Sequence, residues 1–163
     1  MEPLTAAQLR DSFINCSKGE RSKIAVPADV SFDGLDFLGW RDAKAPDRAY
    51  LVTWADGRPV GIAMRAASKG TRSLTRSTMC SMCLTAHTSS GVTLFTAPLR
   101  GESGRNGNTV GNYMCANLQC SRYVRGELKS DAIVPVVETV DLDTRVERLR
   151  TRVSAFVAKV SAG

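Results

Sequence analysis

The sequence of 163 residues contains a single histidine, His87, and this scarcity excludes several classes of enzyme. Hydrolase triads need a histidine base, and the His-Glu-x-x-His metalloprotease motif needs two histidine ligands. The glycine-rich stretch at residues 101–111 lacks the Gly-Lys-Ser/Thr ending of a phosphate-binding loop. No motif with paired carboxylates is present. We therefore expect a protein that is not an enzyme and that has no small-molecule substrate.

The chain also lacks long hydrophobic runs. None approaches the roughly 20 apolar residues that a membrane-spanning helix requires. The N-terminus reads Met-Glu-Pro-Leu-Thr, with an acid where a secretory signal carries positive charge, and no apolar stretch follows. We expect a cytoplasmic protein without a membrane partner. Because thiols stay reduced in that compartment, the five cysteines indicate metal binding or redox chemistry rather than disulfides.

Acidic residues are scarce in the middle of the chain. Residues 65–130 contain nine Lys or Arg but only Glu102 and Glu127, whereas the segments on either side are close to neutral. This imbalance indicates a basic surface suited to an acidic protein or to RNA, although a generally solvated surface is the simpler alternative. Few aromatic residues lie among these arginines, which disfavours stacking on single-stranded RNA.

Two cysteine pairs are the most informative feature that is present. Cys80 and Cys83 lie in Cys-Ser-Met-Cys, and Cys115 and Cys120 lie in Cys-Ala-Asn-Leu-Gln-Cys. Four thiolates with this spacing can bind one tetrahedral zinc ion, and such a site keeps no open position for a substrate. We therefore predict one structural zinc per chain. The fifth cysteine, Cys16, is expected to be a small buried apolar residue of an N-terminal helix.

The order of the cysteines favours a treble-clef zinc finger. The first pair should form a tight knuckle, a hairpin should follow, and the second pair should lie at the start of a helix, where the helix dipole favours negative charge. His87 lies four residues after Cys83. It is predicted to lie on the surface of the finger or to hydrogen-bond a sulfur, with a role as a substitute ligand as the alternative.

Local patterns predict an α+β protein with a small antiparallel sheet, flanked by N- and C-terminal helices. We expect one domain, residues 1–163, with three parts. Residues 1–66 form an N-terminal helix and a β-hairpin, residues 76–128 form the zinc finger, and residues 140–161 form an amphipathic helix.

Several elements have specific signals. Thr5 and Gln8 fit a capping box, and Asp56-Gly57 fits a type I′ turn. The remaining expectations are a helix over 6–16, apolar core anchors at 36–40, strands at 50–54 and 60–64, a basic loop at 66–75, strands at 92–96 and 110–114, a flexible loop at 100–112, a helix at 116–125, and a last helix at 141–161 whose apolar stripe includes Leu142.

Candidate partner contacts lie around the finger. Arg122, Tyr123 and Arg125 follow the last cysteine, and an aromatic ring between arginines is a good contact set for protein or RNA. Arg100 and Arg105 lie in the glycine-rich stretch, whose reach would place them against a partner. The alternative is that Tyr123 or Val124 packs under the finger while the arginines are solvated.

These residues also resemble a known family. The order Cys80-Ser-Met-Cys83, a glycine-rich hairpin, Tyr113-Met-Cys115 and Cys120-Ser-Arg-Tyr-Val-Arg-Gly126, with the upstream run 35–52, is similar to the C-terminal zinc finger of elongation factor G-binding proteins. This is the FusB-like fusidic acid resistance family, in a short form found in actinobacteria. The resemblance covers about residues 1–128.

The resemblance implies a concrete activity. Family members bind elongation factor G through the zinc-finger domain and help it leave the ribosome when fusidic acid holds it there. Their zinc is structural, and Cys80, Cys83, Cys115 and Cys120 match its ligands. The full-length resistance proteins begin with a helical bundle, whereas one short helix is expected here. A basic zinc finger that binds RNA or the ribosome, with ribosomal RNA as its partner, is the alternative.

Overall fold

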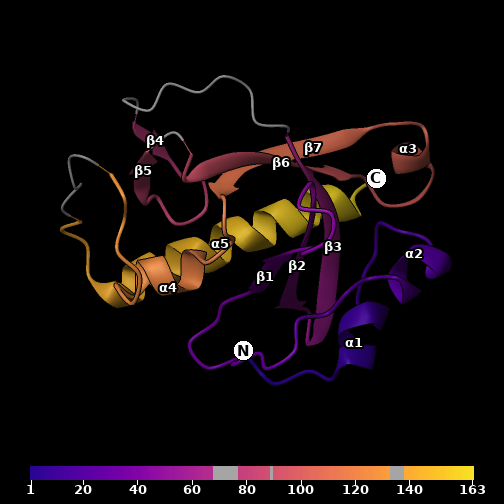
Figure 1. The fold of residues 1–163 in the computed structure, drawn as a ribbon, viewed down its shortest axis with the longest axis horizontal. Coiled ribbons are helices and arrows are strands. Elements are labelled where there is room, and N and C mark those ends of the chain that lie inside the picture. Colours follow the sequence, from indigo (N-terminus) through magenta and orange to yellow (C-terminus); the bar gives the residue numbers. More distant parts are fainter. Residues whose placement is uncertain (68–76, 89, 133–137) are drawn as a thin grey trace.

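A five-stranded antiparallel sheet in the order β1-β2-β3-β6-β7 forms the centre of the protein (Figure 1). The computed structural model describes residues 1–67, 77–88, 90–132 and 138–163, so most of the basic loop expected at residues 66–75 lies outside the described residues. Strands β4 and β5 form a separate two-stranded ribbon. The expectation of an α+β fold is confirmed. The elements are α1 (Ala6–Asp11), α2 (Lys18–Ser22), β1 (Leu38–Arg41), β2 (Arg48–Ala55), β3 (Arg58–Ala66), β4 (Ser77–Met79), β5 (Ala86–Thr88), β6 (Val92–Pro98), α3 (Gly101–Arg105), β7 (Thr109–Cys115), α4 (Cys120–Val124) and α5 (Leu142–Ser161).

The β2–β3 hairpin has the predicted turn. Asp56 and Gly57 both have positive φ, +50° and +72°, as a type I′ turn requires. Strand β2 is buried on both faces, so its apolar residues divide between two cores. Ala49 and Leu51 belong to the larger core, and Tyr50 and Val52 belong to the smaller one. The hairpin therefore links the two halves of the hydrophobic interior.

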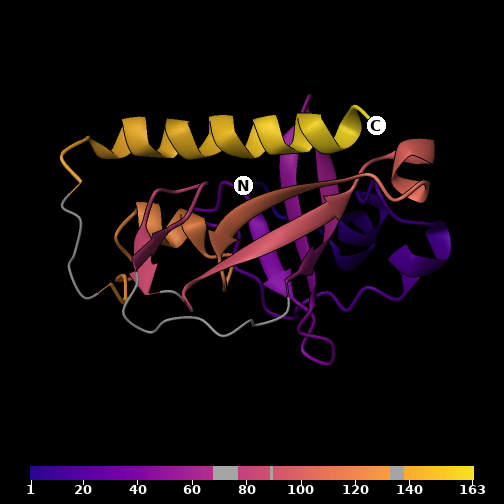
Figure 2. The same cartoon turned by 90° about the horizontal axis from the view of Figure 1, so that it is seen from above.

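Helix α5 covers one side of the sheet and runs along much of the long axis of the molecule (Figure 2). Asp141 caps it by accepting a hydrogen bond from the backbone N–H of Thr144 at 2.9 Å. Its buried stripe faces the larger core, whereas Leu142, expected in this stripe, is exposed. Among the described residues, no helix is long and apolar enough to cross a membrane. The buried residues of α5 are Val146, Leu149, Val153, Phe156, Val157 and Val160.

The N-terminal helix is shorter than predicted. The Thr5–Gln8 capping box is present, but α1 ends at Asp11 rather than at residue 16. The next residues leave the helix because they hydrogen-bond to β3. Ile14 N–H donates to Gly61 O at 3.0 Å, and the Asn15 side chain donates to Ala63 O at 2.9 Å. Strand β3 pairs with β6 only at its last two residues, so this part of its edge is open to residues 12–15.

Three further expectations need correction. Cys16 follows α1 instead of lying on it, and it is half-buried rather than fully buried. The stretch at 100–112 is not a flexible loop, because it contains α3 and the start of β7. The helix expected at 116–125 is only α4, since Leu118 has a φ of +58° and interrupts a helix there.

Candidate metal centre

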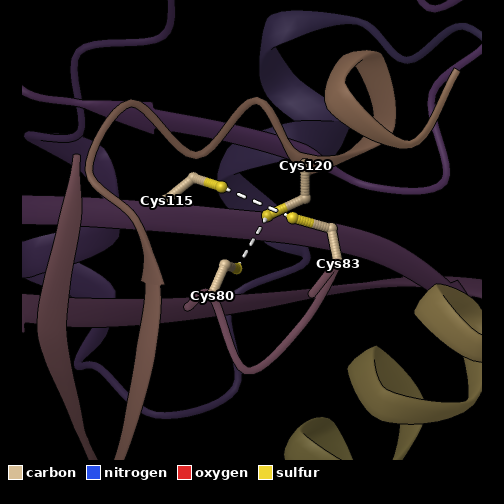
Figure 3. A group of neighbouring side chains, drawn as sticks. All are labelled: Cys80, Cys83, Cys115 and Cys120. Atoms are coloured by element: carbon tan, nitrogen blue, oxygen red, sulfur yellow. Dashed lines mark hydrogen bonds between the residues drawn. The ribbon is translucent and has the colours of Figure 1, made fainter. Parts of the chain in front are cut away.

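The four paired cysteines converge at one point (Figure 3). They lie at or beside β4, β5 and α4, which share one end of the molecule (Figure 1). Cys80 directly follows β4, and Cys83 lies in the turn that leads to β5. Cys115 is the last residue of β7, and Cys120 is the first residue of α4. The four Sγ atoms lie within 4.8 Å of one another, and all four side chains are buried.

The sulfur distances fit a tetrahedral metal site. Cys80 Sγ lies 3.7 Å from Cys120 Sγ, and Cys83 Sγ lies 3.5 Å from Cys115 Sγ. Four sulfurs around zinc with bonds of about 2.3 Å are separated by about 3.8 Å, whereas a disulfide needs about 2.05 Å. The donor set and its geometry therefore suit zinc, and the cluster supports a zinc site.

The four thiols of the cluster do not ionise independently of one another. Hydrogen bonds from the Cys115 and Cys120 thiols lower the pKa of Cys80 far below its usual range. The pKa of Cys120 is raised, because the other cysteines hydrogen-bond to its neutral form and because it is buried. One thiolate thus opposes the formation of the next. Four thiolates at this site would need a divalent cation to offset their charge.

Two turns position the cysteines. In the first, the backbone N–H of Leu84 donates to Cys80 O at 3.0 Å, and the N–H of Met82 points at Cys80 Sγ at 3.4 Å. Leu84 has a φ of +62°. In the second, Leu118 N–H donates to Cys115 O at 2.8 Å. Both turns place a leucine in the left-handed region, and the tertiary structure must hold it there.

His87 forms part of the surroundings of the cluster. Its Nε2 atom lies 3.4 Å from Cys115 Sγ, and its Nδ1 atom lies 3.1 Å from Asp131 Oδ1. The predicted contact with a sulfur is confirmed, but His87 is buried and not on the surface. Tyr123 packs edge-on against the imidazole, with ring centroids 4.7 Å apart. Gly91 passes so close that a Cβ there would lie 2.5 Å from His87 Cβ.

A buried carboxylate ties the finger to the rest of the fold. Asp36 accepts two hydrogen bonds from Arg125, at 2.6 and 3.2 Å, and a third from Arg150 Nε at 2.9 Å. Its backbone N–H donates to Ser121 Oγ at 3.0 Å. Ser121 directly follows Cys120. The network therefore fixes α4 against β1 and α5, and nothing in the local sequence pattern points to it.

The five expected partner-contact residues do not form one surface. Arg100 and Arg105 lie at α3, and Arg122, Tyr123 and Arg125 lie at α4, near opposite ends of the molecule in both views. Arg125 is bound to Asp36, and Tyr123 packs against His87 as the alternative reading proposed. Arg100, Arg105 and Arg122 are exposed. A partner role for any of the five stays a prediction.

The connectivity of the site defines a class of protein. A knuckle, the β6–β7 hairpin, a second knuckle and a short helix follow in the order of a treble-clef zinc finger. A family model described as "FBP C-terminal treble-clef zinc-finger" matches residues 8–160. The chain therefore belongs to this FusB-like family. The match extends beyond the expected limit of residue 128 and includes α5.

A solved structure has the same fold. The structure of the fusidic acid resistance protein FusC matches with a TM-score of 0.56 and 15% sequence identity. The match covers 98% of this chain but 58% of the FusC chain, so this chain spans a little over half of that protein. A comparison with curated proteins found no match.

Proposed function

We propose that the protein is a non-enzymatic zinc-finger module that binds elongation factor G and promotes its release from the ribosome. Membership of the FusB-like family is the observation that carries this proposal. In this function one zinc ion, held by Cys80, Cys83, Cys115 and Cys120, is structural, and no bond is made or broken. The activity would place the chain in the cytoplasm, where its partner works.

The cysteine cluster supports a structural role for the metal. All four sulfurs are buried and face one another, so a bound zinc would have four protein ligands and no open position. Two of the cysteines come from the turn between β4 and β5, one from the end of β7 and one from the start of α4. Zinc would therefore join two segments that are distant in sequence, residues 80–83 and 115–120, and binding of the metal would be coupled to folding of the finger.

A calorimetric titration tests the partner. Purified elongation factor G is added to the zinc-loaded protein, to Cys115→Ser and to Cys16→Ser. Cys16 lies outside the cluster, so it is the matched control for the loss of a thiol. We expect saturable binding by the wild type and by Cys16→Ser, and loss of binding by Cys115→Ser. Absence of binding by the zinc-loaded wild type would contradict the proposal.

Release from the ribosome needs its own assay. Elongation factor G is held on ribosomes with fusidic acid, and the factor that stays bound is measured after pelleting. The protein is expected to lower the bound fraction in proportion to its concentration. If the titration shows binding but the pellet keeps all of the factor, the protein binds elongation factor G without rescuing it.

RNA binding is the second candidate, and the basic middle of the chain favours it. Arg100, Arg105 and Arg122 are exposed, and among the described residues none has a carboxylate within ion-pair distance. Binding to ribosomal RNA would weaken steeply as salt rises, with a slope set by the number of phosphates neutralised. A titration with ribosomal RNA at several salt concentrations separates this candidate from protein binding.

A further inference from the structure

Strand β7 forms one edge of the five-stranded sheet, and alternate residues direct their backbone groups away from β6. Thr109 lies opposite Pro98, which has no N–H to donate, so this is a non-hydrogen-bonded pair. Gly111 and Tyr113 share this orientation because the pattern repeats every two residues. Tyr113 O accepts a hydrogen bond from Ser81 N–H at 2.7 Å, outside the sheet.

Most of this edge has no partner among the described residues. Apart from Tyr113 O, no hydrogen bond is formed by the outward N–H and C=O groups of Thr109, Gly111 and Tyr113 within residues 1–67, 77–88, 90–132 and 138–163. All three residues are exposed, and Tyr113 is 54% exposed. Because glycine has no side chain, the exposure of Gly111 is exposure of its backbone. The edge is therefore accessible to another strand.

The edge also lacks the features that protect natural sheets. Edge strands are commonly short, or carry charged residues or proline. The opposite edge fits this rule, since β1 has four residues and ends in Arg41. Strand β7 has seven residues, Thr-Val-Gly-Asn-Tyr-Met-Cys, with no charge and no proline. An unprotected edge of this length is a template for strand addition.

A groove runs beside this edge, between β7 and α5. Its volume is about 170 Å³. Val110, Gly111 and Asn112 line it on the side of the strand, and Phe156 lines it on the side of the helix. Arg152 and Lys159 of α5 also line it. An added strand would place alternate side chains over this groove.

The charge of the groove selects the occupant. Arg152 donates a hydrogen bond to Ser81 O at 2.8 Å, and Lys159 is exposed. In the described part of the chain, neither has a carboxylate within ion-pair distance. Two uncompensated cations beside open backbone groups favour an acidic segment. A second copy of this chain is disfavoured, because it would bring the same two cations to the same interface.

We propose that the open edge of β7 is the docking site for an extended acidic segment of a protein partner. The segment adds to the sheet as a sixth strand. It bonds to the outward N–H and C=O groups of Thr109 and Gly111 and to the outward N–H of Tyr113, and it directs alternate carboxylates to Arg152 and Lys159. The inference rests on the proposed function only in taking the partner to be a protein.

Amide exchange on the zinc-loaded full chain tests the edge itself. The probe is an eight-residue peptide that alternates valine and glutamate, and the comparison peptide alternates valine and lysine. When roughly nine-tenths of the site is occupied, we expect the acidic peptide to slow exchange of the Gly111 and Tyr113 amides about tenfold. The basic peptide should leave these rates unchanged. No slowing with the acidic peptide, or equal slowing with both, would overturn the inference.

A pair of variants isolates the backbone contact. Gly111→Pro removes the outward N–H, and proline is tolerated where an edge N–H faces solvent. Gly111→Ala keeps the N–H and adds the same Cβ, which would lie 3.1 Å from Leu94 Cδ1. The acidic peptide should protect Tyr113 in Gly111→Ala but not in Gly111→Pro. Lys159→Glu leaves the backbone unchanged and should weaken peptide binding severalfold. Full protection of Tyr113 in Gly111→Pro and Lys159→Glu would refute the assignment.

Titration with elongation factor G separates this inference from the proposed function. If the factor binds Gly111→Ala, and binds Gly111→Pro about tenfold more weakly, the result supports both the proposed function and the β7 docking site. Equal binding to the two variants means that the factor docks elsewhere. This result overturns the assignment of the β7 edge as a docking site but is compatible with the proposed function. If the factor does not bind the wild type but the acidic peptide protects β7, the proposed function is refuted and the assignment of the β7 edge as a docking site stands. Protection of β7 that rises with protein concentration alone would assign the edge to a second copy and overturn the inference.

Discussion

Removal of the Asp36 carboxylate should destabilise the protein more than removal of any exposed carboxylate. Its side chain is 1% exposed, and it accepts three N–H groups from Arg125 and Arg150. Its backbone O accepts from Thr53 Oγ1 at 3.0 Å. Asp36 thus joins β2, α4 and α5. Because α4 begins with Cys120, Asp36 also supports the position of a cluster cysteine. Loss of the carboxylate removes one of the contacts that hold α4 in place.

The exposure of the two arginines sets the size of the effect. Breaking a buried ion pair costs about 3–5 kcal/mol when the remaining charge stays buried. Here Arg150 is 57% exposed and Arg125 is 18% exposed, so water can partly solvate both after the carboxylate is lost. We therefore expect Asp36→Ala to lower the free energy of unfolding by about 2–3 kcal/mol. Arg150→Ala should cost less than about 1 kcal/mol, as for an exposed pair.

Urea unfolding of the zinc-loaded protein measures these values. Asp47→Ala is the matched control, since Asp47 pairs with Arg65 where both side chains are more than half exposed. It should cost at most about 1 kcal/mol. Adding Arg125→Ala to Asp36→Ala should lower the free energy of unfolding by at most about 1 kcal/mol more, because the two residues share one interaction. If Asp36→Ala is as stable as Asp47→Ala, the reasoning is wrong.

Three further changes test the surroundings of the cluster and the cap of α5. Gly91→Ala should cost about 1–3 kcal/mol in urea unfolding, because the new Cβ would lie 2.5 Å from His87 Cβ, and an unchanged midpoint would contradict that contact. His87→Ala removes the imidazole whose Nε2 lies 3.4 Å from Cys115 Sγ, and it should weaken zinc binding about 10- to 100-fold, as measured by competition with a chelating dye. Equal zinc affinity of the variant and the wild type would show that this contact does not contribute to metal binding. Hydrogen bonds from the Thr144 backbone and side chain lower the pKa of Asp141, so its stabilisation is present above the unfolded pKa and is lost as the pH falls through the lower, folded value. A peptide of residues 138–163 should therefore be more helical than its Asp141→Ala form at pH 7, and circular dichroism should show this difference shrinking in strong acid. A difference of unchanged size in acid would refute the assignment.

Local signals in the sequence predicted the elements that depend on neighbouring residues. The cysteine spacing predicted the cluster, and Asp56-Gly57 predicted a turn that requires two positive φ values. The Thr5–Gln8 capping box and the apolar stripe of α5 were predicted in the same way. Each signal lies within a few residues of the structure that it specifies. The FusB-like resemblance followed from such signals and agrees with the family match.

Contacts between distant residues explain what the sequence did not predict. Residues 12–15 leave the helical path because β3 offers open hydrogen-bonding groups nearly fifty residues away. Asp36 is separated by 89 residues from Arg125 and by 114 residues from Arg150. No pattern around Asp36 indicates this network. The arginines expected to contact a partner fall into two groups that the fold separates, because α3 and α4 lie near opposite ends of the molecule.

The zinc content of the untagged protein tests the central claim most directly. Elemental analysis should find one zinc per chain in the wild type and in Cys16→Ser, and little or none in Cys115→Ser. Cys115→Ser should also lose protection from amide exchange across the finger, since metal binding and folding are coupled. A folded wild-type protein without zinc, or Cys115→Ser with unchanged melting and exchange, would contradict a fold built on a four-cysteine zinc site.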